Sequence, residues 1–145
     1  MINFTIPGNP KALKRHRNFT RGSFHGNYDP SANDKRTFLD LSFNYRPDTP
    51  IIEPIKLQIE FYFDRPKSHF GTGKNKDIVK ESAPIFHTTK PDTSNLIKFI
   101  EDAFNGVFWK DDSLICELHC RKYYSNKPRT VIIITILKNI PFVTE

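Results

Sequence analysis

The feature that most constrains this 145-residue chain is a strict alternation over residues 55–63. Apolar residues occupy every odd position of the segment IKLQIEFYF, and polar residues or tyrosine occupy the even ones. This period of two predicts a strand with one face buried and the other facing water. A second segment, VIIITIL at 131–137, is apolar almost throughout, which predicts a central strand covered on both faces. The chain is therefore organised around a sheet.

Two segments, one on each side of the alternating strand, carry helical signals. Ser31 is placed to cap a helix over 32–46, which the following proline ends. Over 93–107, apolar residues recur at spacings of three and four, which is the pattern of a helix with one buried face. Thr93 or Ser94 is the expected cap of this second helix.

The remaining strands complete a single small domain. Residues 2–6 alternate as a first strand, and residues 114–124 alternate as a strand that we expect to form a hairpin with 131–137. The order strand, helix, strand, helix, strand, strand predicts an α+β fold over 1–145. In this fold a mixed β-sheet has helices packed on one face.

Two long segments show little periodicity. Residues 15–30 are basic and contain glycine, and residues 65–89 are polar and rich in turn-forming residues. Both are predicted to be exposed, mobile loops, and long loops of this kind are often functional. The tail after Lys138 is also expected to be loose.

The charge balance favours a polyanionic partner. Lys and Arg number 22 against 16 Asp and Glu, giving a net charge of +6. Such a surface attracts nucleic acid, although a basic surface without that role stays possible from charge alone.

The compartment is expected to be the cytoplasm. The start of the sequence has no apolar stretch typical of a signal peptide, and no segment is long and apolar enough to span a membrane. In a strand, Cys116 and Cys120 would lie too far apart for a disulfide, so we expect free thiols in a reducing environment.

Acidic residues flank the second helix in the segment KPDTSNLIKFIEDAFNGVFWKDD, residues 90–112. Asp92 precedes the helix, and Asp111 and Asp112 follow it. If the helix turns the chain back on itself, Asp92 and Asp112 meet near one end of the sheet. Carboxylates held together favour a hard cation such as Mg²⁺ or Mn²⁺.

The same helix has one polar stripe. Ser94, Lys98 and Asp102 are spaced four residues apart and fall on one side. A lysine beside a metal-bound phosphodiester can offset developing negative charge. Spacing alone leaves an ordinary interpretation open, in which Asp92 is a turn residue and Lys98 and Asp102 form a surface ion pair.

Residues 90–112 resemble the signature of the RusA-like Holliday junction resolvases, roughly K-P-D-x-D-N-L-x-K followed by D-A-L-N-G and D-D. The segments FTIPGNPKALKR and YDPSANDKRTF resemble the opening strand, basic loop and first helix of that family, so the similarity covers most of the chain. It implies a crossover junction endodeoxyribonuclease. Such enzymes are Mg²⁺-dependent homodimers, often from phages or prophages, that cut four-way junctions by paired nicks in recombination and repair.

The resemblance also implies roles for individual residues. Asp92 and Asp112 would be catalytic metal ligands, and Lys98 would be the catalytic lysine. Asp111, Ser94 and Asp102 would be weaker or additional ligands. The side chains expected to contact DNA are those of Lys11, Lys14, Arg15, Arg17, Lys90 and Lys122.

Ser94 departs from the family pattern, which has an aspartate at this position. A neutral hydroxyl is a weaker ligand than a carboxylate, so a second hypothesis is a protein that binds junctions and cuts them weakly or not at all. A third is a small basic protein directed at RNA on the same scaffold.

Overall fold

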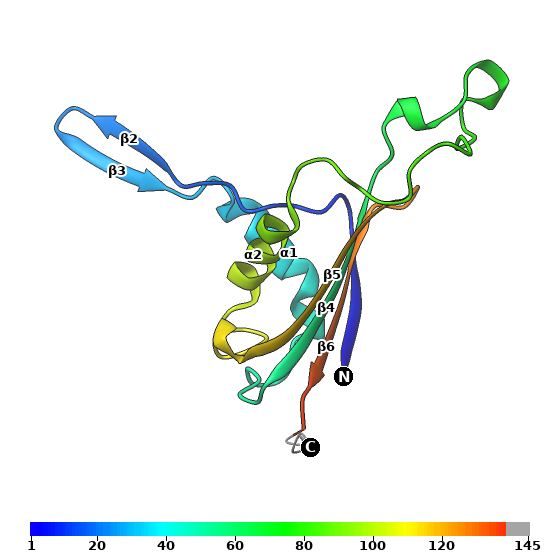
Figure 1. Cartoon of the computed structure of the whole chain (residues 1–145). Coiled ribbons are helices and arrows are strands. Elements are labelled where there is room, and N and C mark those ends of the chain that lie inside the picture. Colours follow the sequence, from blue (N-terminus) through cyan, green and yellow to red (C-terminus); the bar gives the residue numbers. More distant parts are fainter. Residues whose placement is uncertain (139–145) are drawn as a thin grey trace, which may run out of the picture.

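The computed structural model describes residues 1–138, which form a four-stranded sheet, two helices and a separate two-stranded ribbon (Figure 1). The sheet contains β1 (Ile2–Pro7), β4 (Ile55–Phe63), β5 (Ile115–Tyr124) and β6 (Arg129–Ile136), and the helices are α1 (Ala32–Ser42) and α2 (Thr93–Phe104). The ribbon pairs β2 (Arg17–Arg21) with β3 (Phe24–Tyr28). The predicted α+β class with a mixed sheet is confirmed. The expected loose tail, residues 139–145, lies outside the described residues.

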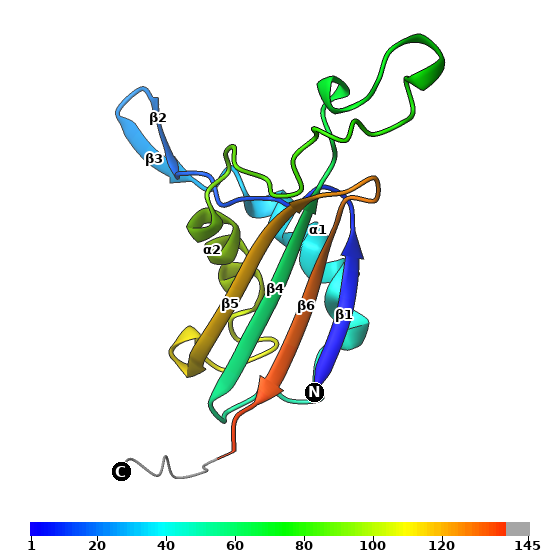
Figure 2. The same ribbon diagram turned by 45° about the vertical axis from the view of Figure 1, so that its right-hand side comes forward.

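The strands of the sheet lie in the order β1-β6-β4-β5 (Figure 2). β4 runs parallel to β5 and antiparallel to β6, and β6 runs antiparallel to β1. The predicted hairpin of the last two strands is therefore wrong, because β4 lies between them. The crossover through α2 brings β5 alongside β4 as a parallel neighbour, and β6 pairs with the opposite edge of β4.

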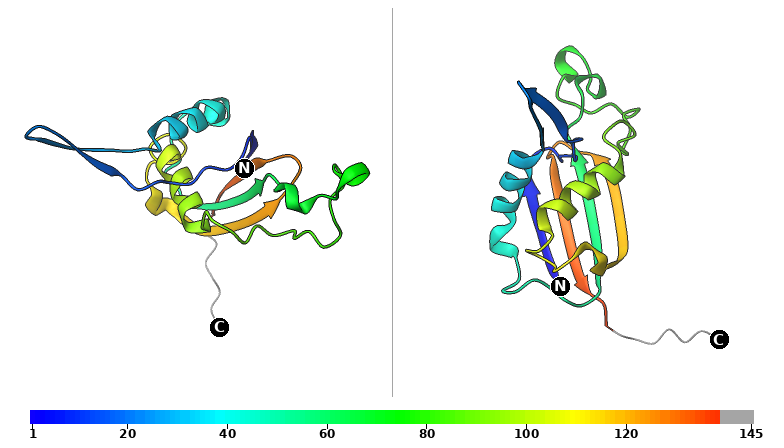
Figure 3. Two further views of the ribbon diagram at one scale, coloured as in Figure 1. Left: turned by 90° about the horizontal axis from the view of Figure 1, so that it is seen from above. Right: turned by 90° about the vertical axis from the view of Figure 1, so that its left-hand side faces the viewer.

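The core lies between the helices and one face of the sheet. α2 buries Leu96, Phe99, Ile100, Ala103 and Phe104, which is the face predicted from the sequence. Both helices lie on the same side of the sheet (Figure 3), and β6 accordingly buries alternate residues. Ile132 and Ile134 are buried against the helices, whereas Val131 and Ile133 are only half-buried on the other face. The prediction that this strand is covered on both faces is wrong within the described chain.

Residues 15–30 differ most from the predicted loop. β2 and β3 form an antiparallel ribbon that projects from the body of the domain (Figure 1). Gly22, with a φ of +60°, begins the two-residue turn between the strands, a conformation that glycine adopts without strain.

Residues 65–89 are largely irregular, as predicted, with short 3₁₀ turns at Lys67–His69 and Gly73–Asn75. α1 continues into a 3₁₀ turn at Phe43–Tyr45, so the first helical segment stops before Arg46. Within residues 1–138, no helix combines the length and apolar character needed to cross a bilayer.

Phe104 is the side chain on which we expect the core to depend most. It is fully buried, and its ring lies against the rings of Phe4, Phe38, Phe108 and Trp109. Phe104→Ala is expected to lower the free energy of unfolding by about 3–5 kcal/mol through lost burial and the cavity left behind. Urea denaturation measures this, with Leu41→Ala, on the exposed side of α1, as a control that changes it by less than about 1 kcal/mol.

Candidate functional site

The start of α2 presents an exposed carboxylate. Asp92 occupies the cap position with extended backbone, and its carbonyl oxygen accepts hydrogen bonds from the N–H groups of Asn95 and Leu96 at 3.1 and 3.2 Å. Thr93 and Ser94 are the first two helical residues, so the sequence-based choice of cap was displaced by one or two positions. The Asp92 side chain makes no capping hydrogen bond, which leaves its carboxylate available to a ligand.

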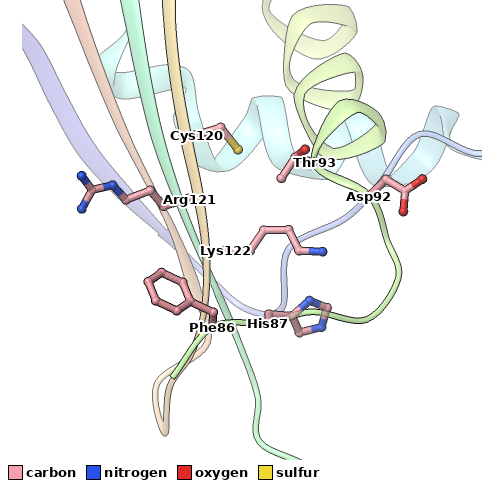
Figure 4. Close-up of a pocket in the computed structure, with 7 residues that line it drawn as sticks. All are labelled: Phe86, His87, Asp92, Thr93, Cys120, Arg121 and Lys122. Atoms are coloured by element: carbon pink, nitrogen blue, oxygen red, sulfur yellow. The ribbon is translucent and has the colours of Figure 1, made fainter. Parts of the chain in front are cut away.

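Asp92 borders an open pocket of about 760 Å³ between α2, β5 and the segment that precedes the helix (Figure 4). Lys122 projects from β5 into it, and its Nζ donates hydrogen bonds to the carbonyl oxygens of Thr89 and Pro91 at 2.8 and 2.7 Å. The ammonium group therefore holds the segment immediately before Asp92. Two of its three N–H donors serve the protein backbone, and the DNA contact expected of Lys122 stays a prediction.

Two other titratable side chains of the pocket are largely uncharged near neutral pH. His87 is buried, its ring stacks on Phe63 at 3.9 Å, and its Nε2 lies 3.2 Å from Oγ1 of Thr89. Burial, and then the positive charge of Lys122, lower the pKa of His87. Burial raises the pKa of the Cys120 thiol to about 11. Cys116 and Cys120 are both free, as predicted.

A basic segment crosses the beginning of α2 and is tied down at two points. The Leu13 N–H donates to the carbonyl oxygen of Asn95 at 3.0 Å, and the Lys14 N–H donates to Oγ of Ser31 at 2.8 Å. Ser31 is fully buried and occupies the predicted cap position of α1, but its hydroxyl makes no capping hydrogen bond and instead anchors the basic segment. The side chains of Lys11, Lys14, Arg15 and Arg17 are exposed.

An ion-pair network joins the base of the ribbon to both helices. The Nζ of Lys35 on α1 contacts a carboxylate oxygen of Asp29, and it lies 3.6 Å from Oδ2 of Asp102 on α2. The hydrogen bond from Lys35 lowers the pKa of Asp29. Ser94, Lys98 and Asp102 are exposed, as the predicted stripe requires, but Asp102 already has a cationic partner within the chain.

The acids after α2 have protein partners of their own. Asp111 accepts a hydrogen bond from the Ser113 N–H at 2.9 Å, and Asp112 accepts one from Nε1 of Trp109 at 2.7 Å. Burial, and then the negative charges of Asp102 and Asp111, raise the pKa of Asp112 against the opposing effect of the Trp109 hydrogen bond. Burial and the charges of Asp112 and Asp102 likewise raise the pKa of Glu101.

Asp92 and Asp112 lie at opposite ends of α2. The helix has 12 residues, and a helix of that length is about 18 Å long. Asp92 immediately precedes it, whereas Asp112 interacts electrostatically with Glu101 in its last turn. The expectation that folding brings these two acids together within one chain is therefore wrong. Among residues 1–138, no three Asp, Glu, His or Cys side chains are grouped closely enough to hold a metal ion together.

A protein-family model described as Endodeoxyribonuclease RusA matches residues 7–135. The chain belongs to the RusA family. A relative in Bacillus subtilis (strain 168), "Uncharacterized protein YqaN", is 33% identical over 135 residues, which cover 92% of this chain and 94% of that protein. RusA proteins are endodeoxyribonucleases associated with Holliday junctions, so the family predicted from residues 90–112 is confirmed.

Sequence reasoning missed several residues that shape the candidate site. Ser31, Asp29 and Lys35 fix the basic segment and the ribbon, and their partners are distant in sequence. The local sequence Asp29-Pro30-Ser31 predicts only the beginning of a helix. It gives no indication that Ser31 contacts Lys14.

The role of Lys122 in holding the segment before Asp92 is testable by its removal. Lys122→Met keeps most of the aliphatic chain but removes two hydrogen bonds from a charged donor. We expect the free energy of unfolding to fall by about 1–3 kcal/mol. Chemical denaturation measures the effect, and Lys127→Met, at an exposed turn position, is the matched control. Equal stability of the two variants would contradict the assignment.

The charge crowding near Asp112 predicts a pH-dependent difference in stability. Because the folded-state pKa values of Asp112 and Glu101 are raised, their stabilising contribution is present at acidic pH and is lost as pH rises through those values. Asp112→Asn keeps an acceptor for Trp109 and removes one charge. At pH 7 the variant is expected to be more stable than the parent by a few tenths to about 1 kcal/mol, since the groups are partly exposed.

Thermal unfolding between pH 3 and pH 8 measures this difference. The gap is expected to close at the acidic end, near and below the ordinary carboxyl pKa of about 4. A gap that widens as pH falls would show that the assigned sign is wrong.

Proposed function

We propose that this protein is a structure-specific endonuclease that cuts four-way junctions and other branched DNA by paired nicks. Membership of the RusA family supports hydrolysis of DNA. The main structural support for branched DNA as the substrate is the position of Asp92. Asp92 caps the beginning of α2, and α2 begins between two projections, the β2–β3 ribbon and the 65–89 segment (Figure 2). Exposed cations follow the chain from Lys11 to Arg17 across this end.

The proposed role of each residue depends on whether it lies near the beginning of α2 or follows its end. Asp92 and Lys98 would act at the phosphodiester, with Lys11, Lys14, Arg15, Arg17 and Lys90 contacting phosphates. Metal dependence on Mg²⁺ or Mn²⁺ is part of the proposal, and Asp92 and Asp112 are separated by α2 within one copy. We therefore propose that Asp92 of one copy and Asp112 of another complete the metal-binding group, with Ser94 and Asp111 as neighbouring oxygen donors.

A homodimer would match the symmetry of the substrate and would allow Asp92 and Asp112 to meet across two copies. A four-way junction has approximate two-fold symmetry, and two matched nicks require two sites related in the same way. Because Asp92 precedes α2 and Asp112 follows it, the contact between copies that this proposal requires involves the side of the domain that carries α2.

A second function is favoured by Ser94. Its hydroxyl stands where the family has a carboxylate, and it is exposed in the first turn of α2 beside Asp92. The corresponding protein would bind junctions without cutting them.

Cleavage of a synthetic four-way junction separates these functions. With Mg²⁺ or Mn²⁺, we expect the unaltered protein to make paired nicks. Asp92→Asn should reduce the rate by at least about 100-fold because it removes a group acting at the phosphodiester. Binding, measured without metal, should change little because that carboxylate makes no phosphate contact. Asp48→Asn, at an exposed position away from α2, is the control for loss of one negative charge.

The binding-only function makes the opposite prediction for Ser94→Asp. An inert parent that gains cleavage through this substitution would replace the nuclease proposal, whereas an active parent removes the alternative. Competition with duplex DNA and structured RNA at fixed salt tests the RNA-directed hypothesis in the same assay.

The shared metal site is tested by mixing subunits. Dimers that combine one Asp92→Asn copy with one Asp112→Asn copy would retain one complete pair of acids, so they should nick one strand although each variant alone is inactive. Inactive mixed dimers would contradict a site divided between copies.

A further inference from the structure

The β2–β3 ribbon carries one aromatic face. In an antiparallel pair, residues opposite each other point to the same side, and side chains alternate along each strand. The register places Arg17 opposite Tyr28, Phe19 opposite Gly26, and Arg21 opposite Phe24. These six residues therefore share one face, on which three aromatic rings alternate with two arginines and a glycine.

Gly26 allows the central ring of this face to lie flat. A Cβ atom added at Gly26 would come within 2.3 Å of the ring of Phe19, so the ring covers the backbone of the opposite strand. The Phe19 ring centroid lies 6.0 Å from that of Phe24 and 6.2 Å from that of Tyr28. The guanidinium carbon of Arg21 is 5.9 Å from the Phe19 centroid. The result is a row of neighbouring rings.

This aromatic face does not contribute to the core. Phe24 is 62% exposed and Tyr28 is 46% exposed, and no ribbon residue belongs to the core cluster of residues 1–138. The ribbon projects away from the sheet and helices (Figure 1, Figure 3). Exposed aromatic surface of this kind, rimmed by charged groups, marks a binding surface rather than a folding requirement.

The charges around the face point to an anionic partner with flat aromatic groups. Lys14, Arg15, Arg17 and Arg21 are exposed cations on the ribbon and its approach. The nearby acid, Asp29, is paired with Lys35. Nucleic acid bases offer π-faces for stacking, and their phosphates suit the arginines.

We propose that the aromatic face of the β2–β3 ribbon stacks on unpaired bases at the exchange point of branched DNA, while Arg17 and Arg21 contact the flanking phosphates. This inference rests on the proposed function and names how the substrate is recognised. In an intact duplex the faces of the bases are covered by their neighbours, so a stacking surface distinguishes a branch point or a single strand from duplex. Each base stacked on an aromatic side chain contributes about 1–3 kcal/mol.

Binding measured without divalent metal tests the proposal on three DNA probes: a four-way junction, a single strand and a duplex. Phe19→Ala is expected to weaken binding to the junction and the single strand by about 5- to 100-fold and to leave duplex binding unchanged. Arg17→Ala should weaken binding to all three and reduce the salt dependence by about one phosphate contact. Leu41→Ala, which removes an exposed apolar side chain from α1, is the matched control.

Gly26→Ala tests the geometry without changing the number of rings or charges. The added methyl group displaces the Phe19 ring, so this variant should resemble Phe19→Ala on all three probes. In the Phe19→Ala background the same substitution should have no further effect. Additive losses would show that Gly26 acts independently of the ring, which would overturn the proposed surface.

The outcomes separate this inference from the nuclease proposal. If the parent and Phe19→Ala bind and cut junctions equally well, the stacking face is wrong and the nuclease stands. If the parent cuts no DNA but its junction affinity depends on Phe19, the face stands and the nuclease does not. Conversion of a dimer to a monomer by Phe19→Ala, measured by light scattering, would identify the face as a contact between copies and overturn the proposal. Unchanged thermal unfolding confirms that the variants are folded.

Discussion

The packing of α2 against one face of the sheet is the constraint on which the candidate site depends. The helix buries five side chains, among them Leu96 at its beginning and Phe104 at its end. This long contact fixes the whole helix axis, so neither end moves independently of the sheet. Asp92 is held at one end and Asp112 at the other. Because the two acids are separated by the helix length, the proposed metal site that uses both requires a second copy of the chain.

A smaller set of contacts determines where the basic segment of residues 11–17 lies. The buried hydroxyl of Ser31 accepts the backbone N–H of Lys14, and Lys35 links Asp29 to Asp102. These contacts hold the base of the ribbon against α1 and α2, while its aromatic face stays clear of the core. A ribbon fixed at its base and exposed beyond it can present rings and cations to a ligand without loss of stability in the domain.

The sequence predicted the elements whose burial pattern is one-sided. The alternation of β4 and the spacing of three and four in α2 identify both elements because each has one apolar face. β2 and β3 lack that contrast, since Arg17, Phe19 and Arg21 lie on the same side and the other side is polar. The Gly22-Ser23 turn was the available signal for a hairpin. The pairing of the last two strands was mispredicted because their short connection does not reveal that β4 lies between them.

The candidate site shows a similar division between local and distant information. The acids and the lysine on α2 are recognisable from their spacing, but their separation depends on the direction in which the chain returns after the helix. Ser94 has a consequence that follows from its position. At a helix N-terminus the backbone dipoles favour anions, so replacing an acid by a neutral hydroxyl there leaves the end of α2 more favourable to phosphate and less favourable to a cation. We therefore expect DNA binding to be less sensitive to this replacement than cleavage, and the proposed cleavage to depend more heavily on Asp92.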